Sequence, residues 1–440
     1  MAPLEWEDEI EGWFWLPTRN PSRVRGKLET SWSDGLTLAL EEPLGEYGEG
    51  EFSRVYGYDM AGRPLVLIDV FTRNRILSTR LPERFLHRLT AQQVLLGTDR
   101  PLTRFPKVIA WFRGLPEFMV GSGVDYEASG RIIWDAPNEH RWVLGDDLVL
   151  VFKHQRELTG GLRDIRMRDD LRVEMRGKRG RRAGQWQTLI HALNVFLGFC
   201  ISNPADFERL VLIGHRGQAV ENRYGLRKIR GADHGRPWIR EWDFQDLGNT
   251  LAAWLRYRDE SPEAFAMIAE YIAFGGHLNL ADRLLLLARF LEVHHRRRHK
   301  SGEFTREAHR NRVREVLTAS PTEHHDWLKG VLEFSNNITL RQRLVELCAQ
   351  TRLPRELLNG TRADFAQGVT RTRNYYTHYS SSEKRKAADG LALAVMVKRL
   401  WLLARSCMLQ EVGFSATEAT EAIRHDHEWR WLCEQRPFRS

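Results

Sequence analysis

Residues 373–378 read Arg-Asn-Tyr-Tyr-Thr-His and carry the most specific pattern in this chain of 440 residues. Residues five apart on a regular α-helix are rotated by about 140° relative to each other. Arg373 and His378 therefore cannot converge on one phosphate from the middle of a straight helix. Helix-like spacing of apolar residues predicts a helix over residues 362–378, and serines at 380–382 interrupt it. We therefore expect His378 at a helix end, facing a cleft.

The side chains of this stretch suit RNA cleavage without a metal. Histidine titrates near neutral pH, so His378 can take the proton of an RNA 2′-hydroxyl or give one to the departing 5′-oxygen. Arg373 stays charged and offers a planar set of donors to the phosphoryl transition state. We expect Asn374 to orient the scissile phosphate or to buttress Arg373. The predicted products are a 2′,3′-cyclic phosphate or 3′-phosphate end and a 5′-hydroxyl end.

The bare spacing of arginine, four residues and histidine is not specific. A chain this rich in arginine and histidine is expected to contain about two such spacings by chance, and two are present. The other joins Arg289 to His294 in the middle of a predicted helix, where the two side chains diverge, so we interpret it as accidental. The helix end and the neighbouring Asn374 and Thr377 favour the pair Arg373 and His378.

Hydrophobic patterning predicts an α+β protein. Short apolar or alternating runs predict strands in the first 160 or so residues, at 13–16, 23–29, 36–40, 54–58, 65–71 and 148–152. A loop or hairpin at 159–184, a helix at 186–200 and a strand at 210–213 follow. From residue 247 the pattern is helical, at 251–258, 262–274, 281–298, 305–317, 322–334, 340–351, 362–378, 384–410 and 416–434.

A domain boundary is expected near residue 277, because Gly275 and Gly276 end a helix there. Residues 1–276 then form a β-rich N-terminal region, with strands to about 160 and mixed α/β structure to 276. Residues 277–440 form an all-α bundle. The chain is long enough for each part to have its own core.

Three segments resemble a known family. Residues 373–379 resemble the active-site motif of HEPN (higher eukaryotes and prokaryotes nucleotide-binding) domains, and the whole chain resembles the ApeA-type anti-phage HEPN proteins. Residues 12–17, with 24–28 and 36–38, are similar to the opening strands of the ApeA N-terminal domain. The helix at 287–296 is similar to the family's leucine-glutamate-aromatic-histidine-arginine helix, although Val293 and His294 depart from it.

The resemblance implies a two-part defence protein. A β-rich N-terminal region would sense or regulate, in response to a phage-derived trigger, and a C-terminal helical HEPN ribonuclease would arrest the infected cell by cutting RNA such as tRNA or mRNA. In such families two protomers each contribute the motif across a two-fold axis, so a homodimer with a composite active site is expected. The alternative is a non-catalytic HEPN dimer that binds nucleic acid or a phage component.

Glu292 is the candidate for holding Arg373, because helices that face the HEPN motif often carry a polar or acidic residue near the active site. The alternative is an ordinary surface salt bridge to Arg289 or Arg296 at helical spacing. Thr377 is the second supporting residue of the predicted site.

The net charge of +8 favours a polyanionic partner, and nucleic acid is the natural one. A generally arginine-rich chain is the alternative. One basic run covers residues 176–182, and another begins with Arg296, Arg297 and Arg298 and continues through arginines 306, 310, 312 and 314. We expect Arg296, Arg297 and Arg298 to bind the RNA backbone, although a solvated helical face is the commoner meaning of such a run.

Cysteine usage and the N-terminus predict a cytoplasmic protein. The cysteines at 200, 348, 407 and 433 lack the paired spacing of a zinc site or a disulfide framework. No metal or cofactor is expected, because the histidine clusters at 324–326 and 425–428 place neighbouring side chains in different directions on a helix. The acidic N-terminus predicts no secretory signal. The most apolar stretch, 391–404, is too short and too charged to span a bilayer.

Overall fold

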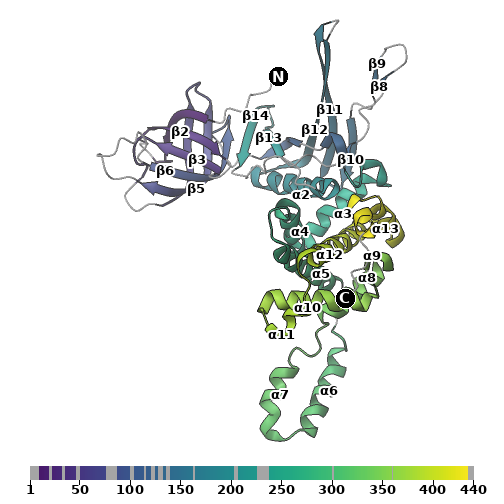
Figure 1. The fold of residues 1–440 in the computed structure, drawn as a ribbon. Coiled ribbons are helices and arrows are strands. Elements are labelled where there is room, and N and C mark those ends of the chain that lie inside the picture. The colour runs from purple at the N-terminus through teal and green to yellow at the C-terminus, as the bar shows by residue number, and fades with distance from the viewer. Residues whose placement is uncertain are drawn as a thin grey trace. The chain divides into compact units, whose positions relative to one another are not determined.

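The computed structural model describes residues 9–18, 22–31, 35–45, 50–75, 87–99, 104–112, 115–119, 124–126, 132–134, 139–161, 164–202, 207–224, 237–299, 302–358 and 360–434. The chain divides into two compact units. The first consists of Met1–Leu197 with Pro204–Gly235 and is rich in strands. The second consists of Gly198–Asn203 with Arg236–Ser440 and is helical. The predicted α+β class is therefore confirmed (Figure 1).

In its described residues the first unit is built on a twelve-stranded sheet with the order β10-β11-β12-β7-β13-β14-β6-β3-β2-β1-β4-β5. An additional pairing of β5 with β6 closes β1 to β6 into a ring. The strands are β1 Glu9–Trp15, β2 Val24–Ser31, β3 Gly35–Leu40, β4 Glu51–Asp59, β5 Pro64–Arg75, β6 His87–Leu96, β7 Phe105–Phe112, β10 Glu139–Leu144, β11 Leu148–Gly161, β12 Asp164–Arg181, β13 Phe207–Ile213 and β14 Ala219–Tyr224. A separate pair joins β8 Val124–Tyr126 to β9 Ile132–Trp134.

Alternation of side chains explains the first strands. In β1 the side chains of Ile10 and Phe14 are buried while Trp13 is exposed, which is the period of a half-buried strand. A glycine is required at residue 12, since a Cβ there would lie 2.1 Å from the backbone oxygen of Tyr58 in β4. The ring of strands is filled by a single apolar cluster that includes both Ile10 and Phe14.

The segment predicted as loop or hairpin is a hairpin. β11 and β12 pair from Leu148 opposite Gly177 to Gly161 opposite Asp164 (Figure 1). Helix α1 (Leu115–Phe118) lies against β12. Helix α2 (Ala183–Ile201) follows, and its Trp186 donates an indole hydrogen bond to the backbone oxygen of Phe105 at 2.9 Å.

The second unit is a helical bundle. Its helices are α3 Leu247–Glu260, α4 Pro262–Phe274, α5 Leu280–Arg298, α6 Arg306–Ala319, α7 His325–Leu332, α8 Leu340–Gln350, α9 Arg355–Leu358, α10 Arg362–His378, α11 Ser381–Lys384, α12 Gly390–Glu411, α13 Ala416–Arg424 and α14 His427–Glu434, with short 3-10 turns at Glu241–Asp243 and Thr322–His324. Helix α12 is the most buried and packs against α5, and α10 packs against α8 and α5. No described helix combines the length and the apolar character needed to cross a membrane.

Helices α6 and α7 form a hairpin that extends from the bundle (Figure 1). Neither helix has a buried residue. Asn336 closes the base of the hairpin, because its side chain accepts from the backbone nitrogen of Phe304 at 2.8 Å and donates to the backbone oxygen of Phe304 at 3.1 Å. The hairpin is therefore an ordered insertion between α5 and α8 rather than part of the core.

Two predicted helices are wrong in extent. The helix expected over 384–410 is divided into α11 and α12, and α12 starts only at Gly390, where the Asp389 side chain accepts from the Gly390 nitrogen. The helix expected over 416–434 is divided into α13 and α14. Asp426 lies between them because its carboxylate is buried against Arg405. The helical unit also includes α3 and α4, which precede residue 277, and the domain boundary near residue 277 stays a prediction.

Candidate functional site

Helix α10 carries the motif and has a well-defined start. The Thr361 side chain accepts from the backbone nitrogen of Asp364, and the Asp364 carboxylate accepts from the backbone nitrogen of Thr361, a reciprocal capping box. Phe365 and Val369 form part of the buried face. The helix covers Arg362–His378, so His378 is its last residue and the predicted position at a helix end is confirmed.

The helix is ended by Tyr379. Its backbone is left-handed, with φ 50° and ψ 33°, and its nitrogen donates to the Tyr375 oxygen at 2.6 Å. Left-handed residues commonly end helices, but glycine or asparagine usually fills the position. The serines at 380–382 were expected to end the helix, yet Ser381 already starts the short helix α11.

Arg373 is held by its neighbour on the helix. Its Nη1 donates to Oδ1 of Asn374 at 3.2 Å. The Thr377 hydroxyl donates to the Arg373 backbone oxygen at 2.8 Å. Within the described part of the chain no carboxylate pairs with Arg373, so its positive charge is available to an anion. This contact corresponds to the buttressing role expected for Asn374.

His378 is exposed on the opposite side of α10 from the buried face. Its position is about 140° around the helix axis from Arg373, with Asn374 and Thr377 in the arc between them. Arg373 is half-buried at the flank of the helix. One protomer therefore presents the two groups in divergent directions, on a surface that is open rather than enclosed.

Glu292 contacts Arg296 and not Arg373. The Glu292 Oε1 accepts from Nη2 of Arg296, one turn later on α5, at 3.0 Å. The surface salt bridge considered as the alternative is therefore the contact present in one protomer. An exposed ion pair of this kind contributes little to stability.

The three arginines at the end of α5 differ in their surroundings. Arg297 pairs with Glu260 of α3 and with Glu411 of α12, and Arg298 pairs with the same Glu411 at 3.0 Å. The Arg296 side chain is 63% exposed. Two of the three predicted RNA contacts thus brace the bundle, and Arg296 is the most accessible.

The second pair at the motif spacing diverges as expected. Arg289 is exposed while His294 is fully buried in α5. Burial, with help from nearby arginines, lowers the pKa of His294 to about 3, so it is neutral. Its Nδ1 lies 3.2 Å from the Tyr257 hydroxyl. His294 is therefore a core residue of the bundle.

Among the described residues one group could offer ligands to a metal ion, namely His295, His299 and Glu346, whose ligand atoms lie within 4.8 Å of one another. Arg343 donates from Nη1 to Nδ1 of His295 at 2.9 Å. The hydrogen of this neutral ring is therefore on Nε2, which lies 2.7 Å from the Glu346 carboxylate. Both ring nitrogens are committed to hydrogen bonds, so the arrangement fits a structural network better than a metal centre.

The tyrosines of the motif were not assigned a role from the sequence. Tyr375, Tyr376 and Tyr379 have ring centroids 5.0 to 6.4 Å apart, all in edge-to-face arrangements. The presence of aromatic residues within the motif was the sequence feature that could have pointed to them. The cluster depends on the left-handed turn at Tyr379, which the spacing of the residues does not reveal.

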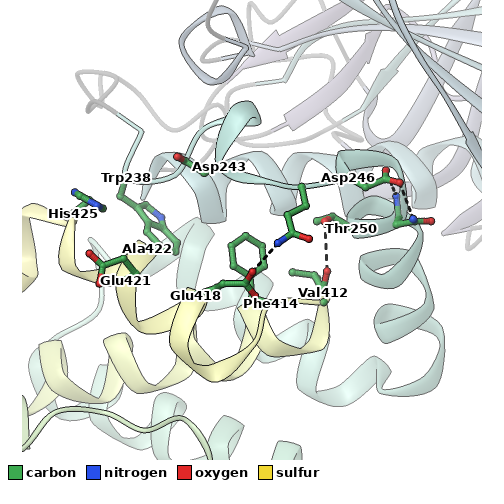
Figure 2. A pocket seen from close by; sticks show the side chains of 13 residues that line it. Trp238, Asp243, Asp246, Thr250, Val412, Phe414, Glu418, Glu421, Ala422 and His425 are labelled. Carbon is green, nitrogen blue, oxygen red and sulfur yellow. Dashed lines mark hydrogen bonds between the residues drawn. The ribbon is translucent and has the colours of Figure 1, made fainter.

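A pocket of about 470 Å³ lies elsewhere in the helical unit (Figure 2). Its carboxylates are already engaged: Asp246 accepts from the backbone nitrogen of Asn249, and Glu418 accepts from the Gln245 side chain at 2.7 Å. Trp238 lines the pocket but is buried, with Arg405 over its ring. Trp238 therefore serves packing. None of the motif residues 373–378 lines this pocket.

Comparisons with known proteins give one match. Residues 285–418 match the family model described as Apea-like HEPN. No curated protein and no solved structure matches the chain. The matched segment begins in α5, ends in α13 and includes all of α10. Residues 285–418 therefore carry an Apea-like HEPN domain, and such a domain suggests a nuclease or defence function in general terms.

Proposed function

We propose that the protein is a metal-independent RNA endonuclease that acts as an abortive-infection effector against phage. The observation that carries this proposal is the end of α10, where an exposed His378 follows an Arg373 that is held by Asn374 and has no carboxylate partner among the described residues. Phosphoryl transfer from RNA needs a charged donor for the phosphoryl oxygens and a group that can exchange a proton, and Arg373 and His378 are candidates for these two roles.

In the proposed reaction His378 takes the proton of the 2′-hydroxyl. The O2′–P bond forms and the P–O5′ bond breaks, and the leaving 5′-oxygen receives a proton. Arg373 stabilises the extra negative charge on the phosphoryl oxygens. The products are a 2′,3′-cyclic phosphate and a 5′-hydroxyl, with no role for a metal.

Base and acid must act on opposite sides of the phosphorus in an in-line displacement. A single His378 cannot occupy both positions, and it diverges from Arg373 by about 140° on its own helix. We infer that two protomers bring their α10 ends together across a two-fold axis. In that homodimer one His378 is the base and its partner's copy is the acid, so the active site is composite.

Backbone binding is assigned to exposed arginines. Arg296 is the accessible member of the run at the end of α5, while Arg297 and Arg298 bind RNA only if they exchange their carboxylate partners. Arg306, Arg310 and Arg314 of α6 are exposed and recur at every fourth residue. Their spacing puts them in one stripe along the helix.

Supporting roles follow from the same contacts. Thr377 fixes the last turn of α10 through the Arg373 backbone oxygen. Glu292 holds Arg296 in one protomer, and in the homodimer it is a candidate to face the motif. The β-rich region before residue 277 is proposed to sense a phage-derived trigger in the cytoplasm and to restrain the nuclease until then.

The test is incubation of the wild type, His378→Ala and His324→Ala with total cellular RNA in EDTA, followed by mapping of the cut ends. His324 is an exposed histidine outside the motif, so its variant is the matched control. Cleavage by the wild type and His324→Ala alone, leaving cyclic phosphates, supports the proposal. Equal cleavage by all three refutes the role of His378. RNA binding without any cleavage, with or without phage lysate, favours the non-catalytic binding dimer.

A further inference from the structure

The rings of Tyr375, Tyr376 and Tyr379 gather at the end of the motif helix. Tyr375 lies 5.0 Å from Tyr376 and 5.7 Å from Tyr379, and the planes are inclined by 64° and 66°. Tyr376 and Tyr379 are 6.4 Å apart at 88°. In an edge-to-face pair the edge of one ring lies against one face of the other, so the opposite face of that ring stays uncovered within the pair.

Tyr376 forms the fixed part of this tyrosine cluster. Its hydroxyl lies 3.4 Å from both the Ala388 oxygen and a carboxylate oxygen of Asp389. The Ala388 nitrogen in turn donates to the buried Thr372 hydroxyl at 3.0 Å. The segment after α11 is thereby tied back to α10. The Tyr376 ring is therefore fixed by its hydroxyl contacts, while Tyr379 lies past the last residue of α10.

Tyr379 is exposed in a conformation that tyrosine rarely adopts. Its side chain belongs to a residue that is 70% exposed, and its φ is +50°. Glycine would end the helix with less strain. A large aromatic residue kept at a strained and solvent-facing position points to a role in binding rather than in packing.

The tyrosines lie beside the phosphate-binding arc of α10. Viewed down the axis of α10, the positions of Tyr375 and His378 differ by a rotation of about 60°. Tyr375 lies on the side of His378 that is away from Asn374 and Arg373. A nucleotide whose phosphate lies beside His378 would extend its base toward Tyr375 and Tyr379. Both faces of an unpaired base are available for stacking, whereas a paired base in a helix has none free.

We propose that the tyrosine cluster is a nucleobase-stacking platform that holds an unpaired base next to the scissile phosphate. This inference rests on the proposed nuclease function. It assigns the substrate as a single-stranded segment, such as a loop or an unstructured region, because the base must leave its own stack to reach the platform.

The test uses the inactive His378→Ala protein as the parent, so that binding is measured without cleavage. The probes are a short fluorescein-labelled single-stranded RNA and an abasic RNA of the same length, followed by fluorescence anisotropy. Tyr379→Gly is expected to weaken binding of the first probe by about 5- to 150-fold and to leave the abasic probe unaffected. Tyr379→Trp is expected to retain most of the affinity.

Stability supplies an independent readout. Tyr379→Gly should unfold at the same temperature as the parent or higher, because glycine suits the left-handed position. Loss of affinity without loss of stability therefore supports the platform. Equal binding of the base-containing probe by the parent and Tyr379→Gly overturns it, as does the absence of any measurable binding by the parent.

The two proposals fail differently. If the wild type cuts no RNA but Tyr379→Gly still loses base-dependent binding, the platform stands and the nuclease assignment falls. If the wild type cuts RNA and Tyr379→Gly binds like its parent, the nuclease assignment stands and the platform falls.

Discussion

Arg373 donates a hydrogen bond from Nη1 to Oδ1 of Asn374 at 3.2 Å, and this is the only side-chain partner of the guanidinium among the described residues. The hydrogen bond fixes the direction of the Arg373 guanidinium, whose side chain otherwise has several rotamers. It leaves the other guanidinium donors for an anion, since Arg has five N–H donors in total. We therefore propose Asn374 as a positioning residue for Arg373.

Removal of this contact is expected to slow cleavage without unfolding the protein. Asn374→Ala should lower the single-turnover cleavage rate by about 10- to 100-fold, the range expected when a hydrogen bond to a charged group is lost. Thermal unfolding should change by less than about 0.5 kcal/mol, as for other surface changes. Arg371→Ala, an exposed change on the same helix, is the control and should retain the full rate. A normal rate in Asn374→Ala would show that Arg373 needs no positioning.

A second prediction concerns the fully buried ion pair between Arg405 of α12 and Asp426. Arg405 also lies between the rings of Trp238 and Trp401, at 4.5 and 4.7 Å. Burial lowers the pKa of Arg405 to about 10, still well above neutral pH, so the charge persists and needs its partner. Asp426→Ala should lower the free energy of unfolding of the helical unit by about 3–5 kcal/mol, measured by denaturant titration.

The matched comparison is Arg424→Ala, which removes an exposed pair with Glu421. Its effect should stay below about 1 kcal/mol. Adding Arg405→Met to Asp426→Ala should restore part of the lost stability, because the uncompensated buried charge disappears. A double variant less stable than Asp426→Ala would contradict this account.

The helix of the motif was predictable because its determinants are local. Thr361 and Asp364 form the capping box, and Phe365 and Val369 recur on one face. These signals lie within one element and need no knowledge of the rest of the fold. The extent of α10 therefore agrees with the prediction at both ends.

Features that depend on distant residues were not predictable. Strands β6 and β7 were not predicted from the sequence. In the structure β6 pairs with β3, β5 and β14, and β7 pairs with β12 and β13. The division of the last predicted helix depends on Asp426 reaching Arg405, 21 residues earlier. Glu292 had three candidate partners, Arg289, Arg296 and Arg373, and the structure shows its contact with Arg296. The partner that such a side chain contacts is determined by the tertiary structure and cannot be predicted from sequence spacing.

A third prediction concerns acid stability of the strand-rich unit. Glu174 of β12 is buried and receives contacts from Lys107, Arg172 and Arg176. Burial raises the pKa of this carboxyl, but the hydrogen bonds from Lys107 and Arg176 and the neighbouring charges outweigh it and lower the pKa to about 2. A folded-state pKa below the unfolded value means that the stabilisation is present above pH 4.5 and is lost as the pH falls toward 2.

The contribution amounts to at most about 3 kcal/mol. The protection factors of the β7 and β12 amides in the full chain, which are corrected for the intrinsic exchange rate at each pH, should therefore fall steeply between pH 5 and 2. Glu174→Gln should be less stable at neutral pH and should show a flatter dependence in that window. A steep wild-type dependence that persists in the variant would assign the acid response to another carboxyl.

The last prediction concerns Arg306, Arg310 and Arg314 on the α6 face of the hairpin. They are exposed, and no carboxylate pairs with them within the described ranges. Each neutralised phosphate contributes about −0.7 to the slope of log affinity against log salt for single-stranded RNA. Replacing all three by Ala should therefore make the slope shallower by about 2 in the His378→Ala background. The variant with Lys at all three positions keeps the charge and should keep the salt dependence of binding. If both variants lose the slope, the geometry of the arginine side chains matters rather than their charge. If neither variant changes the slope, the α6–α7 hairpin does not contact the RNA.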